Sequence, residues 1–310
     1  MDIVEKVEGE NGIYNKLVTI KSTNFEIKDS YNSVIPLNIY LTWSIKKLPP
    51  KMQENVDRMI KVNPEFNIQL FDCNERREFI KNNFSEDILT AYDTLKPGAY
   101  KADLWRLCIL YINGGIYIDI KFNCINNFKF IALTEKEHLV IQIPAHCDLK
   151  EGEIGLINGL IVAKPKKNLL LRCINKISKN VKNKNYGYNY LYPSGPCLLG
   201  SEYIKMLRKN ELTIEAELDK LDLCLNINEQ IIFNNIPILE YYKEYRYEQN
   251  QFAKTQNYFE LYRLKQIYNE AIEPFYNIEN KVYDKKDIYN KYNLILFCAI
   301  VILLSYKLKQ

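Results

Sequence analysis

The order of apolar and polar positions predicts a chain that alternates between strands and helices. Residues 35–43 (IPLNIYLTW) are apolar on both faces, which predicts a buried strand. A helix is expected over 49–62, where apolar positions recur at helical spacing, and an alternating strand over 66–71. This strand–helix–strand order predicts an α/β fold with a mostly parallel central sheet flanked by helices.

The middle of the chain continues this alternation. Its longest helix is expected over 99–112 and ends at Gly114-Gly115, because glycines commonly end helices. Residues 116–122 (IYIDIKF) then predict a strand. The remaining expected elements are short helices at 75–82 and 85–95, strands at 139–143 and 160–162, helices at 166–179 and 197–209, a loop at 180–192 and an aromatic-rich region at 241–276.

The two ends of the chain differ from the main domain, which we expect over 34–280. Residues 1–33 are polar and weakly patterned and predict an N-terminal extension, and 281–291 predict a charged linker. The tail, 292–310, contains the uninterrupted apolar run LILFCAIVILL at 294–304. With its borders, 292–306, it has about 15 residues, against the roughly 20 that span a bilayer. Either it is a membrane anchor that leaves the domain on the cytosolic side, or it is a buried terminal segment of a cytoplasmic protein.

Composition and charge limit the molecules that the chain is expected to bind and the compartment in which it is expected. Of the 310 residues, 47% are hydrophobic and 26% are charged, which is typical of a folded protein. The net charge of +4 is spread along the chain, so a nucleic-acid partner is not expected. Eight scattered cysteines without a CxxC pair, two histidines and an acidic N-terminus favour a reducing compartment and predict neither structural zinc nor a signal peptide.

The most informative chemistry lies between Asp103 and Lys121. Asp103 and Arg106 are three residues apart on the expected helix, where such a pair is most simply a surface ion pair. Asp119 comes near the end of an apolar strand, and the carboxyl ends of strands in α/β sheets face the ligand crevice. A carboxylate there needs a cation or several donors, because burying it unpaired is costly.

This segment resembles the DxD-containing sugar-binding region of glycosyltransferase family 32. That family includes yeast initiating α-1,6-mannosyltransferases and inositolphosphoceramide mannosyltransferases, and the clostridial glucosylating toxins are more distant relatives. The family pattern is an Asp, two residues, an Arg, an apolar helix with Leu-Tyr, and then Gly-Gly-Ile-Tyr-x-Asp-x-Asp. The matching residues are Asp103, Arg106, Leu110, Tyr111, Gly114, Gly115, Ile116, Tyr117 and Asp119.

Other stretches extend the resemblance over about residues 35–270. Trp43 resembles the family's Trp near the nucleotide base, and Asn158-Gly159 resembles a segment that lines the donor pocket. Two departures stand out. Lys121 replaces the second Asp of the DxD motif, and the late segment 257–262 lacks the family's frequent His and Trp.

The resemblance implies a GT-A-like nucleotide-sugar-binding fold and a retaining hexosyltransferase. The expected donor is a UDP- or GDP-sugar, with mannose as the first expectation, and the expected acceptor is a hydroxyl on a glycan or glycolipid. The implied cofactor is Mn²⁺ or Mg²⁺. A catalytically weak or inactive nucleotide-sugar-binding protein of the same fold is the alternative, and Lys121 motivates it.

The resemblance also assigns roles to residues. Asp103 and Arg106 are expected to contact the donor sugar, and Asp119 to contact the metal or the diphosphate. Trp43 and Asn158 are expected in the nucleotide-sugar site, although a core Trp and a turn Asn remain the alternatives. Tyr117 is expected in the core. The whole set is catalytic Asp103, Arg106 and Asp119, donor-binding Trp43, Asp103, Arg106, Lys121 and Asn158, and metal-binding Asp119 and Asn123.

Lys121 creates an electrostatic conflict with the implied metal. On one continuous strand, Asp119, Lys121 and Asn123 would face the same way, so a cation on Asp119 would lie close to the ammonium. Either Lys121 turns to solvent while Asn123 or water completes the metal shell, which is the favoured arrangement, or Lys121 itself neutralises the diphosphate.

Overall fold

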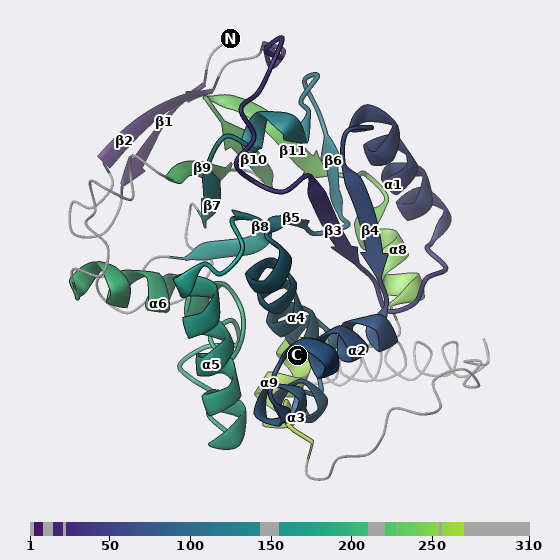
Figure 1. Cartoon of the computed structure of the whole chain (residues 1–310), viewed down its shortest axis with the longest axis vertical. Coiled ribbons are helices and arrows are strands. Elements are labelled where there is room, and N and C mark those ends of the chain that lie inside the picture. The colour runs from purple at the N-terminus through teal and green to yellow at the C-terminus, as the bar shows by residue number, and fades with distance from the viewer. Residues whose placement is uncertain are drawn as a thin grey trace, which may run out of the picture. The chain divides into compact units, whose positions relative to one another are not determined.

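The computed structural model describes residues 23–142, 155–209, 229–253 and 256–269, together with three further strands at 3–8, 15–20 and 221–227 (Figure 1). The chain divides into a compact unit, Met1–Glu270, and a second unit, Ala271–Gln310. The predicted linker at 281–291 and the apolar tail at 292–310 lie outside the described residues, so the membrane anchor stays a prediction. Among the described helices, none is both long and apolar enough to cross a bilayer.

Nine strands form the central sheet. They are β3 (Asn38–Thr42), β4 (Asn67–Phe71), β5 (Gly115–Ile118), β6 (Phe122–Cys124), β7 (Glu137–Gln142), β8 (Leu156–Ala163), β9 (Leu221–Ile227), β10 (Gln230–Phe233) and β11 (Ile236–Tyr241). Their order across the sheet is β4-β3-β5-β8-β7-β9-β10-β11-β6. Strands β1 (Ile3–Glu8) and β2 (Asn15–Ile20) form a separate antiparallel pair within residues 1–33, which from the sequence are expected to be a weakly patterned extension.

Helices cover both faces of this sheet (Figure 1). Helices α1 (Pro50–Val62) and α8 (Tyr245–Phe252) contact each other on one side. The helices of the other side are α2 (Cys73–Asn83), α3 (Glu86–Thr94), α4 (Gly98–Asn113), α5 (Asn168–Lys182), α6 (Pro196–Arg208) and α9 (Tyr258–Arg263). The α/β class with a central sheet flanked by helices is therefore confirmed, and the helices predicted between 49 and 209 occur within a few residues of their expected bounds.

The direction of the strands corrects the prediction of a mostly parallel sheet. Parallel pairing joins β4, β3 and β5, and also β7 and β9, but the other five pairings are antiparallel. For β9, β10 and β11 the cause is the length of the connections, because parallel neighbours need a long crossover, whereas these three strands follow one another closely in the chain. Asn234 and Asn235 connect β10 to β11 with φ of 50° and 66°, the backbone of a two-residue hairpin turn.

Alternate residues of the central strands enter two separate hydrophobic cores. On β5, Tyr117 faces the core of α4 and α5, whereas Ile116 and Ile118 face the core that includes α1. Helix α4 is buried along its whole length from Tyr100 to Leu110, polar residues included. Its charged side chains, Asp103 and Arg106 among them, therefore lie inside the protein and not on its surface.

Two glycines make the sharp connection from α4 to β5. Gly114 ends the helix with a φ of 64°, and its N–H donates to the carbonyl oxygen of Leu110. Gly115 has a φ of 108°, and a Cβ there would lie 2.7 Å from the carbonyl oxygen of Asn38 on neighbouring β3. Both the backbone angle and the close approach require glycine. The connection therefore fixes the position of the residues that follow it, including Asp119.

Replacing Gly115 by Ala should lower the free energy of unfolding by about 2–5 kcal/mol, because the substitution combines backbone strain with a steric clash. Urea unfolding measures the loss. Gly98→Ala is the matched control, since Gly98 begins α4 without a positive φ and alanine favours a helix. Equal unfolding midpoints for the two variants would contradict the role assigned to the turn.

Candidate functional site

A cavity of about 540 Å³ opens where β3 and β5 end. Its walls come from the residues after these two strands, the first turns of α4, the start of β8, the loop before α6, and the segment from β11 into α8. Asp119 is the first residue after β5, whereas the strand predicted over 116–122 would contain it. Of the predicted site residues, the cavity brings together Trp43, Asp103, Arg106, Asp119, Lys121 and Asn158.

Arg106 is the centre of a buried network of charges. Its side chain is only 7% exposed. Nη1 donates to Asp119 Oδ1 at 3.1 Å and to the carbonyl oxygen of Asn158 at 2.7 Å, while Nη2 lies 3.2 Å from Asp103 Oδ1. Nε donates to the carbonyl oxygen of Ala102 at 3.2 Å. Asp103 and Arg106, which their spacing suggested as a surface ion pair, thus form a buried pair. Protein groups surround the Arg106 guanidinium.

Asp103 is held by neutral donors as well as by Arg106. Its Oδ1 accepts from Asn158 Nδ2 and its Oδ2 accepts from Ser194 Oγ, both at 2.8 Å. Burial raises the pKa of Asp103, and Arg106 and the hydrogen bonds oppose that rise. Both carboxylate oxygens are therefore bonded within the protein, so Asp103 fixes the positions of Arg106 and Asn158.

Asp119 faces the cavity between two cationic side chains. Its Oδ1 accepts from the Tyr117 hydroxyl at 2.7 Å and from Arg106, and its Oδ2 lies 2.9 Å from Lys121 Nζ. Burial alone would raise the pKa of Asp119, but Lys121 and Arg106 outweigh it and lower the pKa to about 2. Gly159 leaves room for this carboxylate, since a Cβ there would lie 2.8 Å from Asp119 Oδ2.

Tyr117 contributes to this site, although from the sequence it is expected in the core. Its ring is buried, and the Arg106 guanidinium lies 4.3 Å from the ring centroid. Its hydroxyl reaches Asp119, because residues two apart on a strand point to the same face. The spacing of two residues between Tyr117 and Asp119 is thus the feature of the sequence that could have placed Tyr117 in the site.

The expected strand face formed by Asp119, Lys121 and Asn123 does not exist. Ile120 and Lys121 form a turn between β5 and β6, and the Phe122 N–H donates to the carbonyl oxygen of Asp119 at 3.1 Å. Lys121 turns back toward Asp119, and its side chain is 19% exposed. The arrangement in which Lys121 turns to solvent is therefore not the one found.

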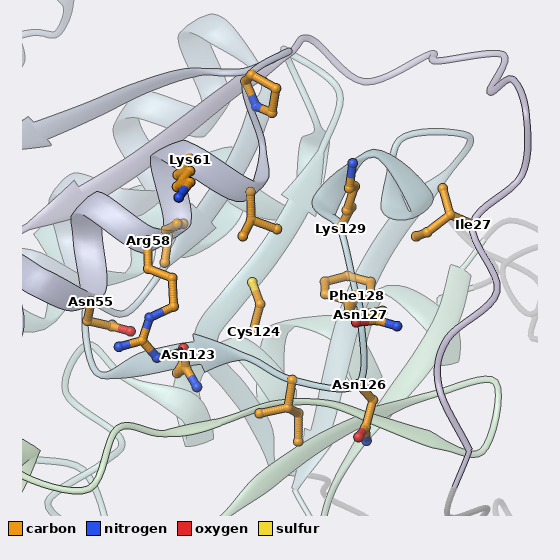
Figure 2. Close-up of a pocket in the computed structure, with 14 residues that line it drawn as sticks. Ile27, Asn55, Arg58, Lys61, Asn123, Cys124, Asn126, Asn127, Phe128 and Lys129 are labelled. Atoms are coloured by element: carbon orange, nitrogen blue, oxygen red, sulfur yellow. Dashed lines mark hydrogen bonds between the residues drawn. The ribbon is translucent and has the colours of Figure 1, made fainter.

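Asn123 lies in a different cavity, of about 590 Å³, between α1 and the segment that follows β6. Figure 2 shows Arg58 pointing toward it, and Arg58 Nη1 donates to Asn123 Oδ1 at 3.1 Å. The prediction that Asn123 shares a metal with Asp119 depends on the continuous strand, and the turn removes that basis.

The residues of the cavity at the ends of β3 and β5 do not fit the divalent cation that the resemblance implies. The carboxylates of Asp103 and Asp119 already have protein donors on all four oxygens. In the sequence, Lys121 stands in the place of the second motif carboxylate. Across the described part of the chain, no cluster of three or more His, Cys, Asp or Glu side chains is suited to a metal. A cation at Asp119 would have to displace an ammonium that neutralises the same oxygen.

One wall of the cavity carries donors that have no partner within the described protein. They are Trp43 Nε1, Ser44 Oγ and Arg76 Nε, all of them buried. Arg76, from α2, is 3% exposed, and its Nη2 contacts the sulfur of Cys73 at 3.1 Å. Buried donors without partners are rare, so an acceptor-rich ligand would satisfy them. No sequence pattern singles out Arg76 or Ser44.

The same substitution at the two buried arginines, Arg76 and Arg106, should have opposite effects on the free energy of unfolding. Arg76→Met removes a buried charge that has no carboxylate partner among the described residues, so the free energy of unfolding should stay the same or rise by up to about 2 kcal/mol. Arg106→Met should cost about 3–5 kcal/mol, since it leaves Asp103 buried without its cation. Chemical denaturation measures both, and equal losses would contradict the assignment.

Comparison with known proteins agrees with this geometry. Residues 49–139 match the family described as "Glycosyltransferase sugar-binding region containing DXD motif". An uncharacterized glycosyltransferase, L373, of Acanthamoeba polyphaga mimivirus is 35% identical over 96 residues, which are 30% of this chain and 38% of that protein. Inositol phosphoceramide mannosyltransferase 3 of Schizosaccharomyces pombe is 25% identical over 177 residues, 57% of this chain and 47% of that protein.

Among solved structures, the PaToxG glycosyltransferase gives a TM-score of 0.44 at 16% identity, over 60% of this chain and 75% of that one. The chain spans about half or less of the length of the curated relatives named above. The matched segment contains α4, β5 and the Asp103–Arg106–Asp119 network. Residues 49–139 are thus similar to the DXD-type sugar-binding region of glycosyltransferases, in agreement with the resemblance of this segment to family 32.

Proposed function

We propose that the chain is a retaining glycosyltransferase with a GT-A-like fold, which moves a hexosyl group from a UDP- or GDP-sugar to a hydroxyl of a glycan or glycolipid. Mannose is the first expected sugar, and the name of the fission-yeast relatives supports it. The observation that carries the proposal is the buried Arg106, which holds Asp119 at the floor of a cavity within the matched family segment.

The proposed reaction breaks the bond between the anomeric carbon and a diphosphate oxygen. Both electrons of that bond stay on the diphosphate, the acceptor hydroxyl oxygen bonds to the anomeric carbon, and the hydroxyl proton passes to the departing diphosphate. The protein therefore has to stabilise negative charge on the leaving group, and fixed positive groups do this most effectively. Lys121 and Arg246 line the cavity and carry such charge.

The hydrogen-bonding groups without protein partners lie on another wall, where the rest of the sugar nucleotide would bind. In the proposal, Trp43 offers a ring surface and an N–H to the nucleoside, while Ser44 and Arg76 offer donors to its oxygen acceptors. Asp103, whose oxygens are occupied, acts by positioning Arg106 and Asn158.

A nucleotide-sugar-binding protein without turnover is the second candidate. The specific observation behind it is Lys121, which stands in the place of a motif carboxylate and binds Asp119 directly. The two candidates share the same ligand and differ in whether the donor is consumed.

Incubation of the full chain with a panel of UDP- and GDP-hexoses, with sugar and glycolipid acceptors, should release UDP or GDP for one donor. Asp119→Asn should lower that turnover by roughly 10²–10³-fold, because it removes the charge that orients Lys121 and Arg106 at the leaving group. Asn123→Ala, in the other cavity, is the control and should keep normal turnover.

Two results would count against the proposal. Normal turnover of Asp119→Asn would show that the reaction occurs elsewhere, and tight donor binding without release of UDP or GDP for any donor would favour the binding protein.

A further inference from the structure

We infer that the ammonium of Lys121 supplies the positive charge that a divalent cation supplies at a DXD motif, so that the donor's diphosphate binds here without metal. The inference rests on the proposed function, because it concerns the same cavity and the same donor. It names Lys121 as the residue that contacts the leaving group.

The position of the ammonium is fixed from several sides. Nζ lies 2.9 Å from Asp119 Oδ2 and 4.7 Å from the centroid of the Tyr241 ring. The backbone of Lys121 is also held, since its carbonyl oxygen accepts from the Tyr242 N–H at 3.0 Å. A charge fixed in this way needs little rearrangement when the ligand arrives.

The Lys121 ammonium has further N–H donors for phosphate oxygens. A lysine has three N–H donors, and Asp119 takes one of them in the structure. Lys121 lines the donor cavity, so the remaining donors are available to diphosphate oxygens without loss of the Asp119 contact. Charge-assisted hydrogen bonds of this kind are the strong ones.

The balance of charge also favours the ammonium over a metal. Arg106 and Lys121 already neutralise Asp103 and Asp119. A divalent cation bound to Asp119 would add two positive charges next to two cationic side chains, which repel it at such short distances. The diphosphate, by contrast, brings oxygen acceptors that the ammonium of Lys121 can contact directly.

A second cation, Arg246, also contacts the Tyr241 ring. The Arg246 guanidinium is 5.4 Å from the ring centroid of Tyr241 and 5.5 Å from that of Tyr245, with its side chain 63% exposed. Glu229 is its ion-pair partner at 3.8 Å, a distance typical of a weak exposed pair. Lys121 inside and Arg246 at the rim therefore offer a diphosphate two cations along one wall.

The role of Lys121 in the step follows from this placement. When the bond to the anomeric carbon breaks, its electrons remain on the diphosphate oxygen, and the nearby ammonium stabilises that added charge. Asp119 Oδ2, 2.9 Å from Nζ, stabilises the charged form of Lys121 in this position.

Calorimetric titration of the full chain with UDP and with GDP, in EDTA and in Mn²⁺, tests the inference without relying on turnover. Wild-type affinity for the diphosphate that binds should be the same within about threefold in the two buffers. Lys121→Gln should weaken it roughly 10- to 100-fold, whereas Lys121→Arg keeps the charge and most of the affinity. Lys121→Asp restores the family's second carboxylate and should bind only in Mn²⁺.

Lys243→Gln is the matched control, because Lys243 is an exposed lysine on the segment that follows β11 and lies outside the cavity lining. It should leave the affinity unchanged within about twofold. A thermal melt of each variant reports whether it is folded, and the charge-conserving Lys121→Arg gives the comparison if the glutamine variant is unstable.

The outcomes separate this inference from the proposed function. If wild-type protein binds UDP or GDP only in Mn²⁺, or if Lys121→Gln and Lys121→Asp bind like wild type in EDTA, the inference is overturned and the glycosyltransferase proposal stands. If neither diphosphate binds in either buffer, the proposed function is overturned, and the role of Lys121 with it.

Discussion

The buried guanidinium of Arg106 is the constraint on which the site depends. Moving such a charge out of water costs several kcal/mol, and only well-placed partners offset that cost. The partners come from three elements: Asp103 on α4, Asp119 after β5, and the carbonyl oxygen of Asn158 on β8. The network therefore joins the central helix to two adjacent strands of the sheet.

Backbone geometry lets these elements approach so closely. Gly115 brings β5 against β3 directly after the helix, and Gly159 leaves space beside the Asp119 carboxylate. Charge and backbone are thus coupled, because a side chain at either glycine would move Asp119 away from Arg106 and Lys121. The cavity for the proposed donor is the space that this arrangement leaves at the ends of β3 and β5.

The sequence predicts these features where local pattern determines them. The helix–glycine–strand order places Asp119 at a strand end, and the family resemblance selects six residues that line one cavity. The features that the sequence does not predict are those that depend on tertiary contacts. The burial of Arg106 comes from the packing around α4, and the place of Asn123 is set by the turn after β5. Helix α2 brings Arg76 to the cavity, and no spacing of residues in the sequence indicates this. The strand–helix–strand order at the start of the chain also does not predict the antiparallel pairing of β9, β10 and β11.

A double-mutant cycle on Asp103 and Arg106 tests the buried network most directly. The free energies of unfolding of wild type, Asp103→Asn, Arg106→Met and the double variant give the coupling energy between the two side chains. If the pair is buried and mutually neutralising, the coupling should be about 1.5–3 kcal/mol, in line with values for contacting residues in one network. A coupling of about 0.5 kcal/mol or less, as for an exposed pair one helical turn apart, would contradict the account.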